Sequence, residues 1–255
     1  MAHLRDILVR SAALRRLSSK LFQQVARIYE DPLRNRAFAF LDAILGPQRA
    51  LQAINRLPKL RIALVGCGGI GSAIAYLLAG MGVRRFSFID PDKVEEGNLS
   101  RQILYTLSDV DVYKVDALTK ALRARFRNTK IEVVRASGLS EHAKSFLAAA
   151  DSVICAGDDP PNLAHLLREF VPNQVEIWAC GYALGVSVIR PPSQVKRRAS
   201  SDVEWHALPN GFAPSIGFQN LEIAARCCAM LTIASTAKSK EHLPIHVLDF
   251  RELRT

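Results

Sequence analysis

Paired cysteines and long apolar runs are missing from this chain. No two of the five cysteines have the Cys-x-x-Cys spacing that holds structural zinc. The longest apolar run, Ala73 to Val83, is too short to span a bilayer. Because free cysteines without a secretory signal are typical of a reducing compartment, we expect a cytoplasmic protein with no membrane segment and no zinc site. The cysteines are Cys67, Cys155, Cys180, Cys227 and Cys228.

Repeats, low-complexity tracts and recognised nucleic-acid modules are also missing. Aromatic residues make up only 7% of the 255 residues, and no interleaved aromatic pattern accompanies the formal charge of +10. The basic charge therefore does not predict nucleic-acid binding. The length and an apolar fraction of 49% are sufficient for a full α/β core, so we expect a globular protein.

The first 60 residues differ from the rest in charge. They contain 11 Lys or Arg against four Asp or Glu, which supplies +7 of the formal +10. Apolar residues recur between arginines at roughly helical spacing, and helical sequence continues through Ala53, which argues against a transit peptide. This basic amphipathic helix either docks on the core with a solvated face or holds an acidic peptide substrate. We therefore divide the chain into a basic helical segment, residues 1–60, and a second domain, residues 61–255. The recurring apolar residues are Leu4, Ile7, Leu8, Ala12, Leu14 and Leu17.

A glycine-rich turn follows the first strand-like run, Arg61 to Val65, and precedes a helical run, Ala73 to Met81. A backbone without Cβ atoms can approach phosphate oxygens closely, and the first turn of the following helix offers unpaired N–H groups and a positive dipole end. The pattern predicts a phosphate-binding loop, although a tight strand–helix turn with no ligand would have the same glycines. These glycines are Gly66, Gly68, Gly69 and Gly71.

Asp90 ends the next apolar run, Phe86 to Ile89, about 20 residues after the glycines. An acid at this point accepts hydrogen bonds from ribose hydroxyls in Rossmann-type sites. By themselves, the glycines and Asp90 would favour an NAD-binding or flavin-binding oxidoreductase.

A further set of polar residues separates the chain from the redox enzymes, which need no such set: Asp92, Asn98, Arg101, Gln102, Lys114 and Asp158. With it, the chain resembles the ThiF/MoeB/E1-like adenylyltransferase family from about Arg61 to about Ala237. The resemblance implies that the glycine loop and Asp90 hold the adenosine part of ATP, that four of the polar residues hold its phosphates, and that Asp158 binds Mg²⁺. The four residues are Asn98, Arg101, Gln102 and Lys114, and we include Asp92 among the nucleotide-binding residues.

The chemistry implied by the family suits these residue types. A carboxylate attacks the α-phosphate of ATP, expels pyrophosphate and becomes a mixed anhydride that a nucleophile can open. Negative charge accumulates on the phosphates, where Arg101, Lys114 and a magnesium ion on Asp158 would neutralise it.

Simpler interpretations exist for three of these residues. Asp158, followed by Asp159 and two prolines, fits a helix cap before a helix near Asn162. Lys114 also fits a solvated helix lysine, and Asn98 fits a turn residue. Only their occurrence together favours a site.

Within the family, the chain is most similar to the branch that modifies ribosomally made peptides, such as the maturation enzymes of microcin C7 and pantocin A. The alternative within the family is activation of a ubiquitin-like sulfur carrier at its C-terminal glycine. The segment Lys196 to His206 contains no cysteine, so we do not expect thioester transfer. Lys196 to Pro214 is long enough to form a loop over the substrate carboxylate. Its Glu204, Trp205 and His206 either contact the acceptor or form an exposed loop with no catalytic role.

Relatives in the family place an arginine from an N-terminal segment into the ATP site of a partner subunit. The segment Asp31 to Asn35 loosely resembles that segment, so Arg34 is the candidate and Arg36 the reserve. This resemblance implies a homodimer, while plain surface solubility is the alternative.

Alternating strand-like and helical runs predict an α/β fold: a Rossmann-like, mostly parallel sheet with helices on both faces, preceded by a short helical N-terminal segment. Beyond the first two strands, we expect strands at Lys130 to Arg135, Ser152 to Ala156, Glu176 to Tyr182, Gly185 to Arg190 and His246 to Phe250. We expect helices at Val110 to Phe126, Glu141 to Ala149, Asn162 to Val171 and after Ser215.

Overall fold

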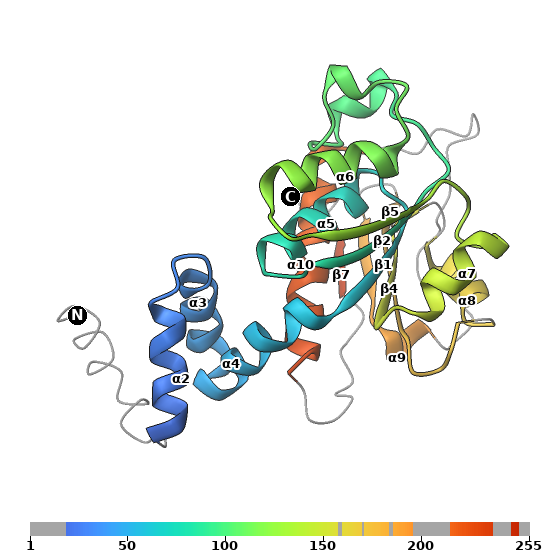
Figure 1. The fold of residues 1–255 in the computed structure, drawn as a ribbon. Helices are drawn as coiled ribbons and strands as arrows, with labels where there is room; N and C mark the ends of the chain where they lie inside the picture. Colours follow the sequence, from blue (N-terminus) through green and yellow to red (C-terminus); the bar gives the residue numbers. More distant parts are fainter. Residues whose placement is uncertain are drawn as a thin grey trace.

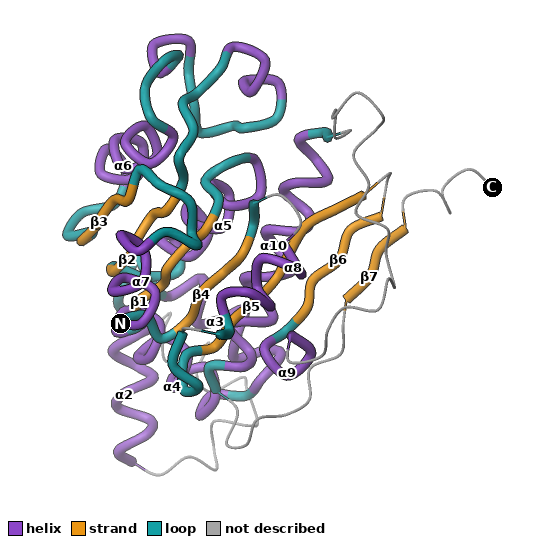
Figure 2. The backbone as a smooth tube through the Cα atoms, turned by 90° about the vertical axis from the view of Figure 1, so that its right-hand side faces the viewer, coloured by secondary structure: helices purple, strands orange, loops and turns teal. Residues whose placement is uncertain are grey.

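A seven-stranded sheet forms the centre of the computed structural model, which describes residues 19–157, 160–169, 171–183, 186–195, 215–236 and 246–249 (Figure 1). The strand order is β3-β2-β1-β4-β5-β6-β7 (Figure 2). Neighbours from β3 to β5 are parallel, whereas β6 and β7 are antiparallel to their neighbours. The strands are β1 (Arg61–Val65), β2 (Arg85–Ile89), β3 (Lys130–Val134), β4 (Ser152–Cys155), β5 (Glu176–Ala183), β6 (Val186–Arg190) and β7 (His246–Asp249).

Helices cover both faces of this sheet, as the sequence predicts. Residues of β1 alternate between the faces: Ile62 and Leu64 pack with α5, α6 and α10, whereas Ala63 and Val65 pack with α7, α8 and α9. The parallel strands are therefore buried on both sides. The helices are α2 (Ser19–Tyr29), α3 (Asn35–Leu45), α4 (Pro47–Arg56), α5 (Gly69–Gly80), α6 (Lys114–Arg125), α7 (Glu141–Ala148), α8 (Pro160–Leu167), α9 (Pro192–Val195) and α10 (Gly217–Ala234).

The helices α2, α3 and α4 form a helical N-terminal segment with a hydrophobic cluster of its own. Figure 1 shows α2 and α3 projecting away from the sheet, with α4 between them and the sheet. Arg49 Nε donates to Thr236 Oγ1 at 3.3 Å, and Arg56 Nη1 donates to the Ser235 carbonyl at 3.0 Å. Two α4 arginines thus attach this segment to the end of α10, where helix carbonyls lack intrahelical partners.

Three predicted helix boundaries were wrong by four residues, and the first is the start of α5, which lies at Gly69 and not at Ala73. The helix predicted from Val110 begins only at Lys114, because Asp111 has φ +67° and its N–H donates to the Val94 carbonyl. The helix predicted to end at Val171 ends at Leu167, consistent with the restriction that Pro172 places on the residue before it.

Some sequence predictions concern residues that the structure does not describe. They are the amphipathic helix from Leu4 to Leu17 and the loop Lys196 to Pro214, including Glu204, Trp205 and His206. Within the described ranges, we find no helix with the length and apolar character that crossing a membrane requires.

Phe38 and Phe40 lie on the same helix but differ in burial, which allows a matched test of the N-terminal cluster. The Phe38 side chain is 0% exposed, whereas that of Phe40 is 67% exposed. We expect Phe38→Ala to lower the free energy of unfolding by about 3 to 5 kcal/mol, because it leaves a cavity. Phe40→Ala should change it by no more than about 0.5 kcal/mol. Equal effects in urea denaturation would contradict this account of the packing.

Candidate functional site

The glycine loop lies where the strand order reverses, between β1 and β4, at the carboxyl ends of the strands. In open α/β sheets this crevice is the usual ligand site. Gly66 has φ +95°, and a Cβ atom there would lie 2.5 Å from the Gly157 nitrogen. A Cβ atom on Gly71 would lie 1.9 Å from the Gly66 carbonyl oxygen. Only glycine fits these two positions, so the first turn of α5 packs directly on the loop backbone.

The first turn of α5 leaves backbone donors free. Ser72 N–H donates to the Gly68 carbonyl at 3.0 Å. Among the described residues, no acceptor is present for the N–H groups of Gly69, Ile70 and Gly71. Together with the helix dipole, these donors provide a binding site for an anion such as a phosphate.

Asp90 is 5% exposed and holds the glycine loop in place. Its Oδ2 accepts the Cys67 N–H at 2.6 Å and its Oδ1 accepts the Asp92 N–H at 2.8 Å. Burial raises the pKa of the Asp90 carboxyl, against the opposing effect of these two donors and of Lys114. Each carboxylate oxygen can accept a second hydrogen bond, so ribose hydroxyls remain chemically suitable partners.

Tyr105 also supports the loop, which sequence reasoning missed. Its hydroxyl donates to the Cys67 carbonyl at 2.5 Å and lies 3.3 Å from the Lys114 carbonyl. Burial, with the nearby Cys67 and Asp90, raises the pKa of Tyr105 well above its usual value, so the phenol stays protonated and able to donate. A tyrosine shortly after the Arg101–Gln102 pair was the available signal, but its partner is 38 residues away.

Lys114 is the first residue of α6. Its side chain is 12% exposed, and its ammonium contacts the Asp92 carboxylate at 2.8 Å. The Lys114 N–H also donates to the Asp92 carbonyl at 2.9 Å. The structure thus brings Asp92 and Lys114 together beside Asp90.

The Asn98–Gln102 segment forms a turn beside the loop. Asn98 Oδ1 accepts the Glu95 N–H at 3.2 Å, and the Asn98 carbonyl accepts the Arg101 and Gln102 N–H groups. Asn98 therefore has the structural role that its turn interpretation predicts. Arg101 Nη1 donates to the Gly97 carbonyl at 2.9 Å.

Gln102 lies directly beside the glycine loop. Its Nε2 would be 3.6 Å from a Cβ atom on Gly68. The residue is 4% exposed, and its Oε1 has no hydrogen-bond partner within the described part of the chain.

Of the remaining predicted site residues, Arg34 is not brought to the loop in the described structure. Asp158 lies outside the described residues. Arg34 precedes α3, in the helical N-terminal segment, where its exposed side chain contacts Asp31 at 2.6 Å.

All five cysteines are free and buried. Burial is the largest influence on Cys67 and Cys155 and raises the pKa of both thiols. In the ranges that the structure describes, no three His, Cys, Asp or Glu side chains cluster in a way that would hold a metal ion.

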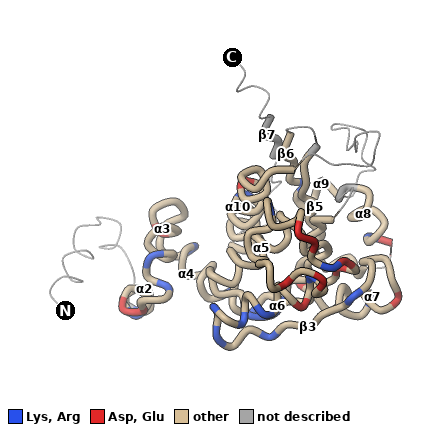
Figure 3. Tube along the Cα trace, turned by 90° about the horizontal axis from the view of Figure 1, so that it is seen from above, with Lys and Arg blue, Asp and Glu red and all other residues tan. Residues whose placement is uncertain are grey.

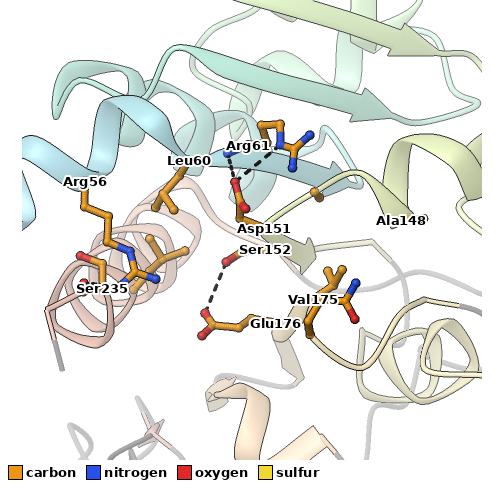
Figure 4. A pocket seen from close by; sticks show the side chains of 12 residues that line it. Arg56, Leu60, Arg61, Ala148, Asp151, Ser152, Val175, Glu176 and Ser235 are labelled. Carbon is orange, nitrogen blue, oxygen red and sulfur yellow. Dashed lines mark hydrogen bonds and ion pairs between the residues drawn. The ribbon is translucent and has the colours of Figure 1, made fainter. Parts of the chain in front are cut away.

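A polar cavity of about 220 Å³ lies at the opposite edge of the sheet, near the amino ends of β1, β4 and β5 (Figure 4). Asp151 Oδ2 accepts the Arg61 N–H at 2.8 Å, and Ser152 Oγ donates to Glu176 Oε2 at 3.4 Å (Figure 4). These lining groups pair with one another, and the cavity is separate from the glycine loop.

The family of this chain follows from its match to a family model. The model of the ThiF family matches residues 42–186, more than half of the 255 residues. The chain belongs to the ThiF family.

Curated relatives share the central part of this ThiF-family chain. The sulfur carrier protein adenylyltransferase of Thermus thermophilus is 34% identical over 115 residues, which cover 45% of this chain and 42% of that protein. The adenylyltransferase and sulfurtransferase uba4 of Aspergillus fumigatus is 34% identical over 114 residues, 45% of this chain and 23% of that protein. The match thus spans less than half the length of either relative.

Solved structures share the fold over nearly the whole chain. Escherichia coli MccB with a succinimide aligns with a TM-score of 0.69 at 18% identity, covering 98% of this chain and 88% of MccB. Its structure with ATP has a TM-score of 0.66 at 19% identity, covering 91% of this chain and 79% of that one. PaaA aligns with a TM-score of 0.68 at 20% identity, covering 98% of this chain and 88% of PaaA. At these identities the likeness establishes the ThiF-type fold.

The contact between Gly71 and Gly66 makes a direct test of this ThiF-family loop. Gly71→Ala should lower the free energy of unfolding by about 3 kcal/mol or more and abolish nucleotide binding, because the added Cβ meets rigid backbone. Gly80→Ala, in the same helix, is the control, since its Cβ would lie 3.9 Å from the nearest atom, in the Phe126 ring. Thermal unfolding and ATP titration check both variants. A Gly71→Ala protein that binds ATP like the wild type would contradict the geometry.

Proposed function

We propose that this protein adenylylates a carboxylate of a peptide with ATP, releasing pyrophosphate, in the maturation of a ribosomally made peptide. The observation that carries the proposal is the set of backbone and side-chain groups around the N-terminus of α5. Free N–H groups at Gly69 to Gly71, the buried carboxylate of Asp90 and the ammonium of Lys114 surround the same loop. An adenine nucleotide with its phosphates needs this combination of donors, acceptor and positive charge.

The proposed reaction makes one bond and breaks one. A carboxylate oxygen attacks the α-phosphorus, and the α–β bridging oxygen leaves with pyrophosphate. The helix N-terminus holds the phosphates, and the charges of Arg101 and Lys114 oppose the negative charge that accumulates on them. Asp90 accepts hydrogen bonds from the ribose hydroxyls, while its bond from the Cys67 N–H keeps the loop folded.

The magnesium part of the proposal depends on the sequence. Asp158 comes three residues after β4 ends at Cys155. Mg²⁺ usually takes one or two carboxylates together with substrate phosphates, so a single aspartate is a suitable protein ligand. Asp158 would hold the ion, which would supply positive charge to the phosphates.

Solved structures of MccB support a peptide carboxylate as the acceptor. Solved structures of MccB hold ATP in one case and MccA in another, and MccB is described as the microcin C7 biosynthetic enzyme. The alternative is activation of a sulfur carrier, which the names of the curated relatives favour. Membership of the ThiF family favours ATP over the NAD of an oxidoreductase.

We include the two-domain division at residue 60/61 in the proposal. The hydrophobic cluster of the first three described helices runs from Val25 to Ile54, and the main cluster begins at Leu57.

Basic residues lie along α2 and α3 and again where α6 is followed by β3, which suits an acidic partner (Figure 3). Exposed residues of the second group are Arg123, Arg125, Arg127 and Lys130.

The proposal also includes a cytoplasmic homodimer in which Arg34, or Arg36 in its place, reaches the ATP site of the partner subunit. Arg34 lies on the projecting helical segment and is exposed, with Asp31 as its ion-pair partner. An arginine supplied to transferring phosphates stabilises the charge of the transition state.

ATP–pyrophosphate exchange with Mg²⁺ tests the reaction. Exchange should require a peptide encoded beside this gene and should vanish with Asp158→Asn. Lys114→Met should lower the exchange rate by about 10²- to 10³-fold, because a charge opposing the phosphates is lost. Lys120→Met is the matched control: Lys120 is on the same helix, 68% exposed and paired with Asp109.

The acceptors in this assay separate the alternatives. Exchange with a sulfur-carrier protein alone would support the second function. No exchange with either acceptor, alongside tight NAD binding, would overturn the proposal.

Mixed dimers test whether Arg34 acts across subunits. Arg34→Ala and Lys114→Met proteins should each be inactive, and their mixture should recover about a quarter of wild-type exchange. Half of randomly mixed dimers are heterodimers, and each has one intact site of two. Arg36→Ala mixed with Lys114→Met tests the reserve residue. If neither mixture regains activity, the partner-subunit role is wrong.

A further inference from the structure

Asn220, in the first turn of α10, contacts the turn at Arg101, Ser215 and the first residue of α5. It is 2% exposed. Its Nδ2 donates to the Arg101 carbonyl at 3.5 Å and to Ser215 Oγ at 3.4 Å. Gly217, at the start of the same helix, lies against the turn at Arg101, because a Cβ atom there would be 3.7 Å from the Arg101 Cα.

The same carboxamide also contacts the first residue of the phosphate-binding helix. A Cβ atom on Gly69 would lie 2.1 Å from Asn220 Nδ2 and 2.8 Å from its Cγ. The Asn220 side chain therefore occupies the space that any larger residue at Gly69 would need. It packs between the α5 N-terminus and the backbone of Arg101.

The polar atoms of Asn220 are not all satisfied. Its Oδ1 is buried and has no hydrogen-bond partner among the residues that the structure describes. Gln102 Oε1, beside the loop at Gly68, also has no hydrogen-bond partner among the described residues. A buried amide oxygen without a partner is costly, and such groups are retained where a bound ligand or a functional geometry requires them.

We propose that Asn220 is a positioning residue of the nucleotide site. Its carboxamide holds the carbonyl of Arg101 against the first turn of α5, and so sets the distance between the Arg101 side chain and the phosphates bound at Gly69 to Gly71. This role depends on the proposed function, because it assumes that ATP phosphates bind at this helix N-terminus. It adds a residue 119 positions away from Arg101 to the site.

Binding of ATP and of adenosine, measured by calorimetry, tests the role without an acceptor substrate. Asn220→Ala should weaken ATP binding by about tenfold, because the Arg101 carbonyl loses its donor. Asn220→Asp keeps the shape but replaces the donor with a negative charge, so it should weaken ATP binding further. Adenosine binding should stay unchanged in both variants, since adenosine has no phosphates.

Gln219→Ala is the matched control. Gln219 is the preceding residue of α10, 4% exposed, and its Nε2 donates to Ser187 Oγ of β6 at 3.3 Å, away from the loop. This variant should lose thermal stability to a similar degree while the ratio of ATP to adenosine affinity stays at the wild-type value.

The outcomes separate this role from a structural one and from failure of the function. If the Asn220 variants weaken ATP and adenosine binding equally, or neither, the positioning role is wrong. If the wild-type protein binds no ATP, the proposed function fails before Asn220 is tested.

Discussion

Direct backbone contact between the α5 first turn and the end of β1 is the constraint on which the site depends. No side chain separates Gly71 from the Gly66 carbonyl, and Gly66 in turn lies against the backbone of residues 156 and 157. This approach fixes where the helix N-terminus lies relative to the carboxyl edge of the sheet. Asp90, Tyr105 and Asn220 are then positioned by contact with the loop and not by each other.

The site residues support one another by opposite kinds of interaction. Asp90 accepts a hydrogen bond from the backbone N–H of Cys67, whereas Tyr105 donates one to the backbone carbonyl of Cys67, so both backbone polar groups of Cys67 are satisfied. The Lys114 ammonium is held by the Asp92 carboxylate, and both charges act on Asp90. The exposed Asp92 carboxylate therefore orders the Lys114 side chain near the loop. Because Asp92 is exposed to water, breaking this ion pair costs little free energy.

Local patterns predicted the parts of the site that are local in sequence. The strand Arg61–Val65, the glycines and Asp90 were predictable because strand, turn and helix follow one another within 30 residues. The start of α6 was predicted wrongly at Val110, because the left-handed conformation of Asp111 depends on the hydrogen bond of its N–H to the Val94 carbonyl. Tyr105 and Asn220 were missed because their partners are distant in sequence, and no periodicity records such contacts. Residue roles toward ATP stay predictions.

The helix α10 begins beside the glycine loop and ends beside the helical N-terminal segment. Asn220 lies in its first turn, against Arg101, whereas Ser235 and Thr236 follow its last turn and accept hydrogen bonds from Arg56 and Arg49. At 1.5 Å per residue, its 18 residues form a rod about 27 Å long. A packed helix moves as a unit, so a tilt imposed where the projecting helices attach would displace the far end at the phosphate loop. The N-terminal helices and the glycine loop are in this sense connected through one continuous helix.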